Sequence, residues 1–102
     1  MLQKYKTRYK RLGLLKEWQR KSRYGMRVGA FASMVQKQMG KCAACLRPFG
    51  KQVKAVDHDH KTGVIRGIIH RQCNSMIGLA KESASILENA AKYLRKGEIH
   101  GN

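Results

Sequence analysis

Acidic side chains are scarce in this sequence of 102 residues. It has 6 Asp and Glu against 22 Lys and Arg, and its formal net charge is +16. An excess this large repels itself in the folded state and attracts polyanions, so nucleic acid is the first partner to consider. Two of the few acids, Asp57 and Asp59, alternate with His58 and His60, which singles out this stretch as a candidate site.

Long apolar runs are also missing. No run reaches the roughly 18 to 20 residues of a membrane span, and the basic N-terminus is not followed by the apolar stretch of a signal peptide. Three cysteines cannot form a closed set of disulfides, and their spacing is that of a metal site. We therefore expect a protein of the cytoplasm with no membrane partner.

The length suits one domain with a modest core, to which a bound metal would add much stability. We divide it into a basic N-terminal arm or helix over residues 1–24, a metal-bound domain over 25–97 and a frayed tail over 98–102. The basic segment is either a solubilising arm or a phosphate-binding helix whose aromatic side chains stack on bases. The candidate nucleic-acid contacts are Arg8, Lys10, Arg11, Arg20, Lys21, Arg23, Lys61 and Arg66.

The apolar pattern predicts an α+β fold. Spacing of three and four residues predicts a helix that begins near Val28 and ends near Gly40. Branched residues on both sides of a turn at residues 61–63 predict two antiparallel strands, from Val53 to Asp57 and from Val64 to Ile69. Two helices are expected after them, over residues 74–79 and 83–96, the second with Ser83 as N-cap.

Two pairs of metal-binding residues frame the acid and histidine stretch. Cys42 and Cys45 form the first pair, and His70 and Cys73 the second. Four such ligands can close a tetrahedral zinc site with no open position, which is the arrangement of a structural zinc. The alternative to a zinc site is three incidental buried cysteines and an unrelated histidine. Within a zinc site, His70 could instead be a packed residue at the end of a strand, and His100 or a water would then be the fourth ligand.

The residues between and after these pairs predict a hydrolytic centre. Cleavage of a phosphodiester needs a base for the attacking water and a cation for the developing charge. His58 can serve as base, while Asp57 and the Asn74 carbonyl can hold a divalent ion; His60 can orient a phosphate or water. Each has a plainer alternative, since Asn74 can cap a helix, Asp57 can pair with a basic side chain, and the histidines can lie on the surface.

Several segments together resemble the phage recombination endonuclease VII family within the His-Me finger nucleases, which are also called HNH-like or ββα-metal nucleases. The resemblance implies a zinc-stapled ββα-metal fold with flanking helices, His58 as general base, and magnesium or manganese on Asp57 and Asn74. The family usually has a cysteine where this chain has His70. The segments that carry the resemblance are Cys42–Cys45, Asp57–Gly63, Arg66–Ile69, His70–Asn74 and Ile77–Gly78.

The resemblance further implies hydrolysis of DNA, on branched or junction DNA in some members, and often a homodimer. For a phage-encoded chain the compartment would be the host cytoplasm. A plain nicking or double-strand endonuclease is an equal expectation. A noncatalytic zinc-dependent DNA-binding module is the alternative from another class, and RNA remains open as a ligand because a basic aromatic arm suits either nucleic acid.

Overall fold

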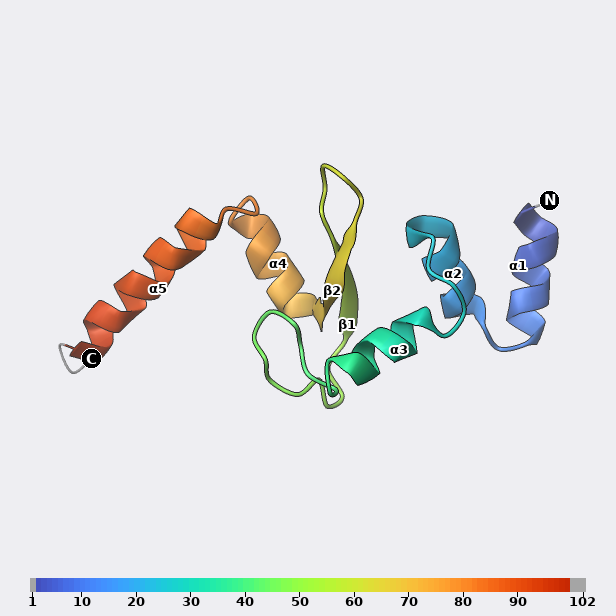
Figure 1. Ribbon diagram of the computed structural model, residues 1–102, viewed down its shortest axis with the longest axis horizontal. Helices are drawn as coiled ribbons and strands as arrows, with labels where there is room; N and C mark the ends of the chain where they lie inside the picture. The colour runs from blue at the N-terminus through green and yellow to red at the C-terminus, as the bar shows by residue number, and fades with distance from the viewer. Residues whose placement is uncertain (1, 100–102) are drawn as a thin grey trace.

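The computed structural model describes residues 2–99, with side-chain surroundings for residues 6–8 and 10–97. Over this range the chain forms five helices and one two-stranded sheet, which confirms the α+β class. The molecule is elongated, with extents of 60 × 29 × 19 Å. The sheet lies near the middle, the first two helices lie toward one end and the last helix toward the other (Figure 1). No helix within the described range is long and apolar enough to cross a membrane.

The N-terminal segment forms two helices, α1 (Leu2–Arg11) and α2 (Leu15–Tyr24). Leu12 lies in the turn between these helices and is 61% exposed. Gly25 ends α2 in the left-handed conformation, at φ 70°, and its backbone N–H bonds to carbonyls of the last turn. A residue without a Cβ adopts this conformation at little cost, which is why a glycine ends the helix here.

Helix α3 (Ala30–Lys37) leads into the first ligand pair. Phe31, Met34 and Val35 pack on the core as the apolar spacing predicted, whereas Val28 precedes the helix and is exposed. After the helix the chain makes a tight turn through Cys42, in which the N–H of Cys42 donates to the Arg47 carbonyl at 2.9 Å. This turn brings the two sulfur atoms of the first pair to one side.

The predicted antiparallel strands are present as β1 (Lys54–His58) and β2 (Ile65–His70). The connecting turn is closed by the Asp59 carboxylate, which accepts bonds from the backbone N–H groups of Lys61 and Thr62 at 2.8 and 3.1 Å. Asp57 lies opposite Gly67, and the register shifts between Asp57 and His58. The strand is therefore irregular where the candidate catalytic residues lie.

Helix α4 (Arg71–Leu79) follows β2 without a loop. It begins three residues before the expected start, so Asn74 lies inside the helix and is not its N-cap. Helix α5 (Ala84–Ile99) has the expected cap, since the Ser83 hydroxyl accepts a bond from the Ile86 N–H at 3.2 Å. It also runs three residues beyond its expected end, while residues 100–102 of the predicted tail lie outside the described range.

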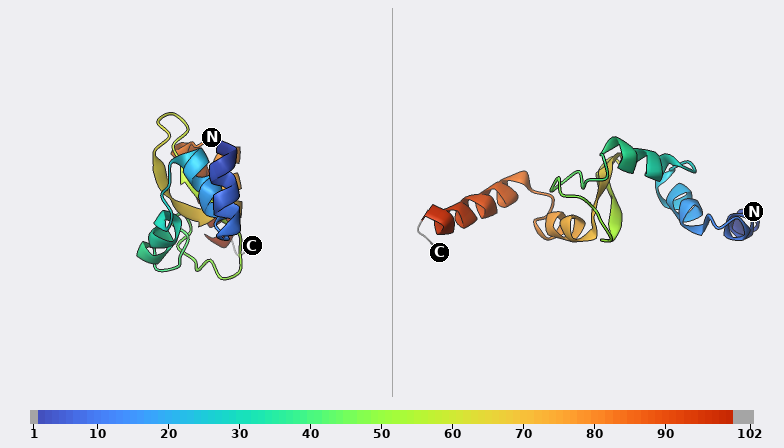
Figure 2. Two further views of the ribbon diagram at one scale, coloured as in Figure 1. Left: turned by 90° about the vertical axis from the view of Figure 1, so that its right-hand side faces the viewer. Right: turned by 90° about the horizontal axis from the view of Figure 1, so that it is seen from below.

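The core is small and surrounds the cysteines. Ile68 is fully buried, and Phe49 and Ile69 are nearly so. These side chains form one cluster with Cys42 and Cys73, against which parts of α3, β1 and α4 pack. Helix α5 extends away from the sheet in Figure 1 and in the right-hand view of Figure 2, and many of its large apolar side chains are exposed.

Candidate metal centre and active site

The four predicted zinc ligands meet in the core. Cys42 and Cys45 come from the turn after α3, His70 is the last residue of β2, and Cys73 lies in the first turn of α4. One ligand atom from each lies within 4.8 Å of all the others. Because β2 passes directly into α4, the His-x-x-Cys spacing places both side chains on the side that faces the turn.

The donor set fits a tetrahedral zinc ion. Nδ1 of His70 lies 3.3 Å from Sγ of Cys45 and 3.9 Å from Sγ of Cys73. Ligands on one zinc ion are about 3.6 Å apart, given bonds of about 2.1 and 2.3 Å. Nε2 of His70 is buried and has no hydrogen-bond partner among the described residues. Nδ1 lies among the sulfur atoms and is therefore the ring nitrogen that would bind the ion, whereas Nε2 is not the ligand atom.

The thiols of this centre differ in their electrostatic surroundings. The Arg47 side chain and backbone lower the pKa of Cys45 to about 6, and Cys42 and His70 add smaller effects in the same direction. Burial raises the pKa of Cys73 to about 12, and the neighbouring cysteines contribute to that increase. A divalent ion would favour all the thiolates together, because its charge outweighs their mutual repulsion.

His58 lies at the end of β1 among aromatic rings. Its ring centroid is 4.8 Å from that of His60, with the planes nearly parallel, and 5.5 Å from that of Tyr24 on α2. The His58 side chain is half-buried. The two neighbouring rings restrict its rotation, and partial exposure leaves it reachable from solvent.

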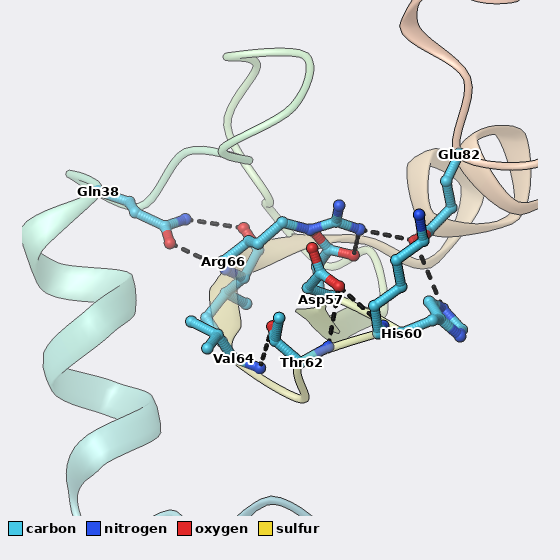
Figure 3. A network of polar contacts seen from close by, with 10 residues as sticks. Gln38, Asp57, His60, Thr62, Val64, Arg66 and Glu82 are labelled. Atoms are coloured by element: carbon cyan, nitrogen blue, oxygen red, sulfur yellow. Dashed lines mark hydrogen bonds and ion pairs between the residues drawn. The ribbon is translucent and has the colours of Figure 1, made fainter.

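Asp57 takes part in a different set of contacts. Its carboxylate accepts two hydrogen bonds from Arg66, at 2.8 Å from Nε and 2.9 Å from Nη2. The same Nη2 donates to Glu82 at 2.8 Å, and Nε2 of His60 lies 3.5 Å from that Glu82 oxygen (Figure 3). The two carboxylates raise the pKa of the Arg66 guanidinium. Asp57 is thus paired with a basic side chain, as the plainer sequence interpretation allowed.

The two residues expected to hold the divalent ion line different hollows. Asn74 lines a hollow of about 370 Å³ between α2 and β1, together with Tyr24. Asp57 lines a second hollow, with Arg66 and Glu82. Both carboxylate oxygens of Asp57 accept hydrogen bonds from Arg66, so a divalent ion at Asp57 would have to replace the guanidinium.

The predicted nucleic-acid contacts divide into free and engaged side chains. Arg20 pairs with Glu17 at 3.2 Å, and its guanidinium lies 3.6 Å from the centre of the Phe31 ring. Arg66 is engaged as described above. The others are exposed on α1, on α2 and at the tip of the β hairpin: Arg8, Lys10, Arg11, Lys21, Arg23 and Lys61.

Sequence reasoning missed several residues of these sites. Glu82 lies in the loop before α5, and its contact with Arg66 spans 16 residues. Gln38 at the end of α3 bonds to Ile68 on β2, across 30 residues. Arg47 is close to Cys45 in the chain and could have been noticed as a positive charge beside a thiol. The first two have no local sequence signal.

A β hairpin followed directly by a helix, beside a Cys₃His cluster that could hold zinc, defines a small α+β protein with a candidate metal centre. The model of the family described as recombination endonuclease VII matches residues 17–96. The chain belongs to this family, which confirms the resemblance inferred from its motifs. The match begins in α2 and ends in α5, so it includes the metal centre, His58 and Asn74.

Two phage proteins of similar sequence extend this comparison. The Gene 59 protein of Mycobacterium phage D29 is 40% identical over 75 residues, which is 72% of this chain and 46% of the relative. The Gene 59 protein of Mycobacterium phage L5 is 36% identical over 73 residues, which is 70% of this chain and 44% of the relative. The chain thus spans less than half the length of these relatives. No solved structure matches.

Proposed function

We propose that this protein is a DNA endonuclease with a structural zinc ion. The observation that carries the proposal is the family match, which extends over the Asp57 and His58 pair, the ligand cluster and Asn74. The net charge of +16 supports a polyanionic substrate. Cys42, Cys45, His70 and Cys73 would hold the zinc, which would fix β2 against α4 and so position Asn74.

His58 is the proposed general base. Hydrolysis of a phosphodiester requires that the attacking water lose a proton, and a neutral imidazole can accept it near neutral pH. The contacts with Tyr24 and His60 hold the ring at the end of β1. His60 is proposed to orient the phosphate or the water, since its side chain is exposed beside His58.

The hollow between α2 and β1 is the proposed binding surface for the DNA backbone. Lys16, Arg20 and Arg23 line it, and Asn74 forms part of its wall. Cationic side chains on one wall place phosphates without reading base sequence. The exposed basic residues of α1 would continue this surface, and affinity should therefore fall steeply as salt increases.

Dependence on magnesium or manganese is part of the proposal. A divalent ion would neutralise the charge that develops on the phosphate. Asp57 and Asn74 are its proposed ligands, and Asp57 would first have to exchange Arg66 for the ion. Preference for branched DNA is likewise a proposal, to be separated from plain nicking by the choice of substrate.

The test is cleavage of supercoiled plasmid by zinc-loaded protein with magnesium or manganese. We expect nicking that His58→Ala abolishes, with unchanged zinc content and DNA binding, because the base is lost and the scaffold is not. Cleavage rates on linear, nicked and branched DNA and on RNA, measured at one salt concentration, define the substrate preference. Full cleavage by His58→Ala would remove His58 from the mechanism.

A noncatalytic DNA-binding module is the second candidate. The observation that favours it is the double hydrogen bond that occupies both oxygens of Asp57. In that case the zinc-loaded protein would bind DNA with a steep salt dependence and would leave plasmid intact with either divalent ion. Binding without cleavage by the unsubstituted chain would establish this alternative.

A homodimer is proposed through α5. Tyr93 is 77% and Leu94 66% exposed on this helix, and Leu79 before it is 86% exposed. Large apolar side chains exposed on one helix offer a surface that a second copy of the chain could cover. Sedimentation of the chain and of Leu94→Lys, with Lys92→Ala as control, would detect the dimer; a monomer at all concentrations would contradict it.

A further inference from the structure

The Arg66 guanidinium binds both carboxylate oxygens of Asp57. Nε and Nη2 each donate to a separate carboxylate oxygen, at 2.8 and 2.9 Å. The Asp57 side chain is 10% exposed. Two parallel charge-assisted bonds satisfy a carboxylate well and fix its orientation. A cation that approaches Asp57 in this conformation meets oxygens that are already bound.

Arg66 itself is less confined than the carboxylate it covers. Its side chain is 40% exposed, and Nη2 also donates to Glu82 at 2.8 Å. Glu82 is 29% exposed and precedes α5, where both Lys81 and Glu82 have positive φ, at 56° and 58°. Such backbone is unfavourable for residues with a Cβ. The guanidinium therefore has a second carboxylate beside it and an open side toward solvent.

We propose that Arg66 competes with the divalent ion for Asp57, and that a DNA phosphate releases the carboxylate by drawing the guanidinium away. This inference rests on the proposed ion-binding role of Asp57. A phosphate offers the same bidentate acceptor geometry as a carboxylate, so the exposed Arg66 can exchange one for the other. Glu82 would keep the guanidinium near the site during the exchange.

The consequence is coupling between DNA and metal binding. If DNA removes the competing cation, DNA raises the affinity for the metal, and the metal raises the affinity for DNA by the same factor. Free protein would then bind the ion weakly, and a complete site would form only with substrate present. Arg66 acts here as a positioning residue, since it controls Asp57 and has no proposed contact with the reacting atoms.

The experiment measures Mn²⁺ binding to zinc-loaded protein by electron paramagnetic resonance, with and without a short DNA duplex. All variants carry His58→Ala so that the duplex stays intact, and binding by the duplex alone is subtracted. We expect DNA to increase the Mn²⁺ affinity of the parent about tenfold or more, within the usual range of coupling. Arg66→Gln should give a similar increase without DNA, and DNA should then add little.

Matched variants assign the effect to the pair. Arg71→Gln, an exposed arginine that follows β2, should behave as the parent does. Adding Asp57→Asn to Arg66→Gln should abolish the gain. Far-ultraviolet circular dichroism and zinc content establish that each variant is folded. Arg66→Lys is the second variant. It should raise the Mn²⁺ affinity less than Arg66→Gln does, because one donor group and the positive charge remain.

Equal Mn²⁺ affinity in the parent with and without DNA and in both Arg66 variants would overturn the inference. A gain in Mn²⁺ affinity that survives Asp57→Asn would overturn it too, because the ion would then lie elsewhere.

These failures differ from failure of the proposed function. If Mn²⁺ binding depends on Arg66 and Asp57 as expected but plasmid stays intact, the nuclease proposal fails alone; if plasmid is nicked and Arg66 has no effect on Mn²⁺, the competition fails alone.

Discussion

The side-chain amide of Gln38 pairs with both backbone groups of Ile68. Nε2 donates to the Ile68 carbonyl at 2.8 Å, and the Ile68 N–H donates to Oε1 at 2.9 Å. The amide thus bonds to β2 as a neighbouring strand would (Figure 3). It fastens the end of α3, and with it the first ligand pair, to the strand that carries His70.

Gln38→Ala should lower the free energy of unfolding by about 1 to 3 kcal/mol, because the buried Ile68 N–H loses its acceptor. The Ile68 carbonyl keeps a bond from Ala43 at 3.1 Å. Urea unfolding of zinc-loaded protein measures the change. Gln36→Ala, at an exposed position of the same helix, should change stability far less, and equal losses in the two variants would contradict the role of Gln38.

Gly67→Ala should destabilise the protein by about 1 to 3 kcal/mol, the usual cost of an overpacked site. A Cβ at Gly67 would lie 3.1 Å from the Ala43 Cβ and 3.4 Å from Gln38 Oε1. Thermal unfolding measures the effect. The matched control is Gly78→Ala in α4, where a Cβ meets nothing within 4 Å and helix propensity predicts a gain of up to about 1 kcal/mol.

Removal of zinc should unfold the domain. The core is small and is built around the cysteine cluster, and zinc contributes about 10 to 16 kcal/mol in peptides of this kind. A strong chelator should reduce the helical circular dichroism signal, and added zinc should restore it. Retention of the full signal after complete loss of zinc, measured by elemental analysis, would show that the ion is not structural.

Substitution at His70 tests the ligand assignment separately. His70→Cys should keep about one zinc per chain, because a thiolate is also a zinc ligand, whereas His70→Ala should reduce the affinity strongly. Both are compared with His60→Ala, which changes a histidine outside the cluster. Normal zinc affinity in His70→Ala would exclude His70 as a ligand.

Acidification should release zinc, and Arg47→Ala should move the release to higher pH. The pKa of Cys45 is lowered from 9.0 to about 6, and the Arg47 side chain is the largest of several causes, followed by the Arg47 backbone. Without the guanidinium part of that lowering is lost, so protons compete for the thiolate at higher pH and displace zinc earlier. A colorimetric zinc indicator gives the midpoint; Arg71→Ala is the control, and an unchanged midpoint for Arg47→Ala would contradict the effect.

Much of the metal centre could be predicted from local spacing. Cys-x-x-Cys and His-x-x-Cys each fix two ligands within one turn of chain, so their positions follow from short-range geometry. The hairpin was predictable for the same reason, because turn residues separate two runs of branched side chains. The start of α4 was predicted three residues late, since β2 passes into the helix without any of the usual capping residues.

The arrangement around Asp57 could not be predicted. The sequence offers Asp57 many basic partners, and its choice of Arg66 depends on the strand register that places Asp57 opposite Gly67, beside Arg66. Glu82 joins the pair only because the loop before α5 returns toward the sheet. Whether Asp57, His58 and Asn74 act together stays a prediction that the cleavage and metal-binding experiments test.

The sequence alone determined the kind of chemistry available: a zinc ligand set, an imidazole beside a carboxylate, and a strong attraction to polyanions. These follow from residue types and short spacings, whose geometry the chain itself restricts. The tertiary structure decided which groups meet. It assembles the zinc ligands, and it pairs Asp57 with Arg66 and Glu82 while Asn74 faces another hollow, because contacts between distant segments depend on packing and register that no local pattern encodes.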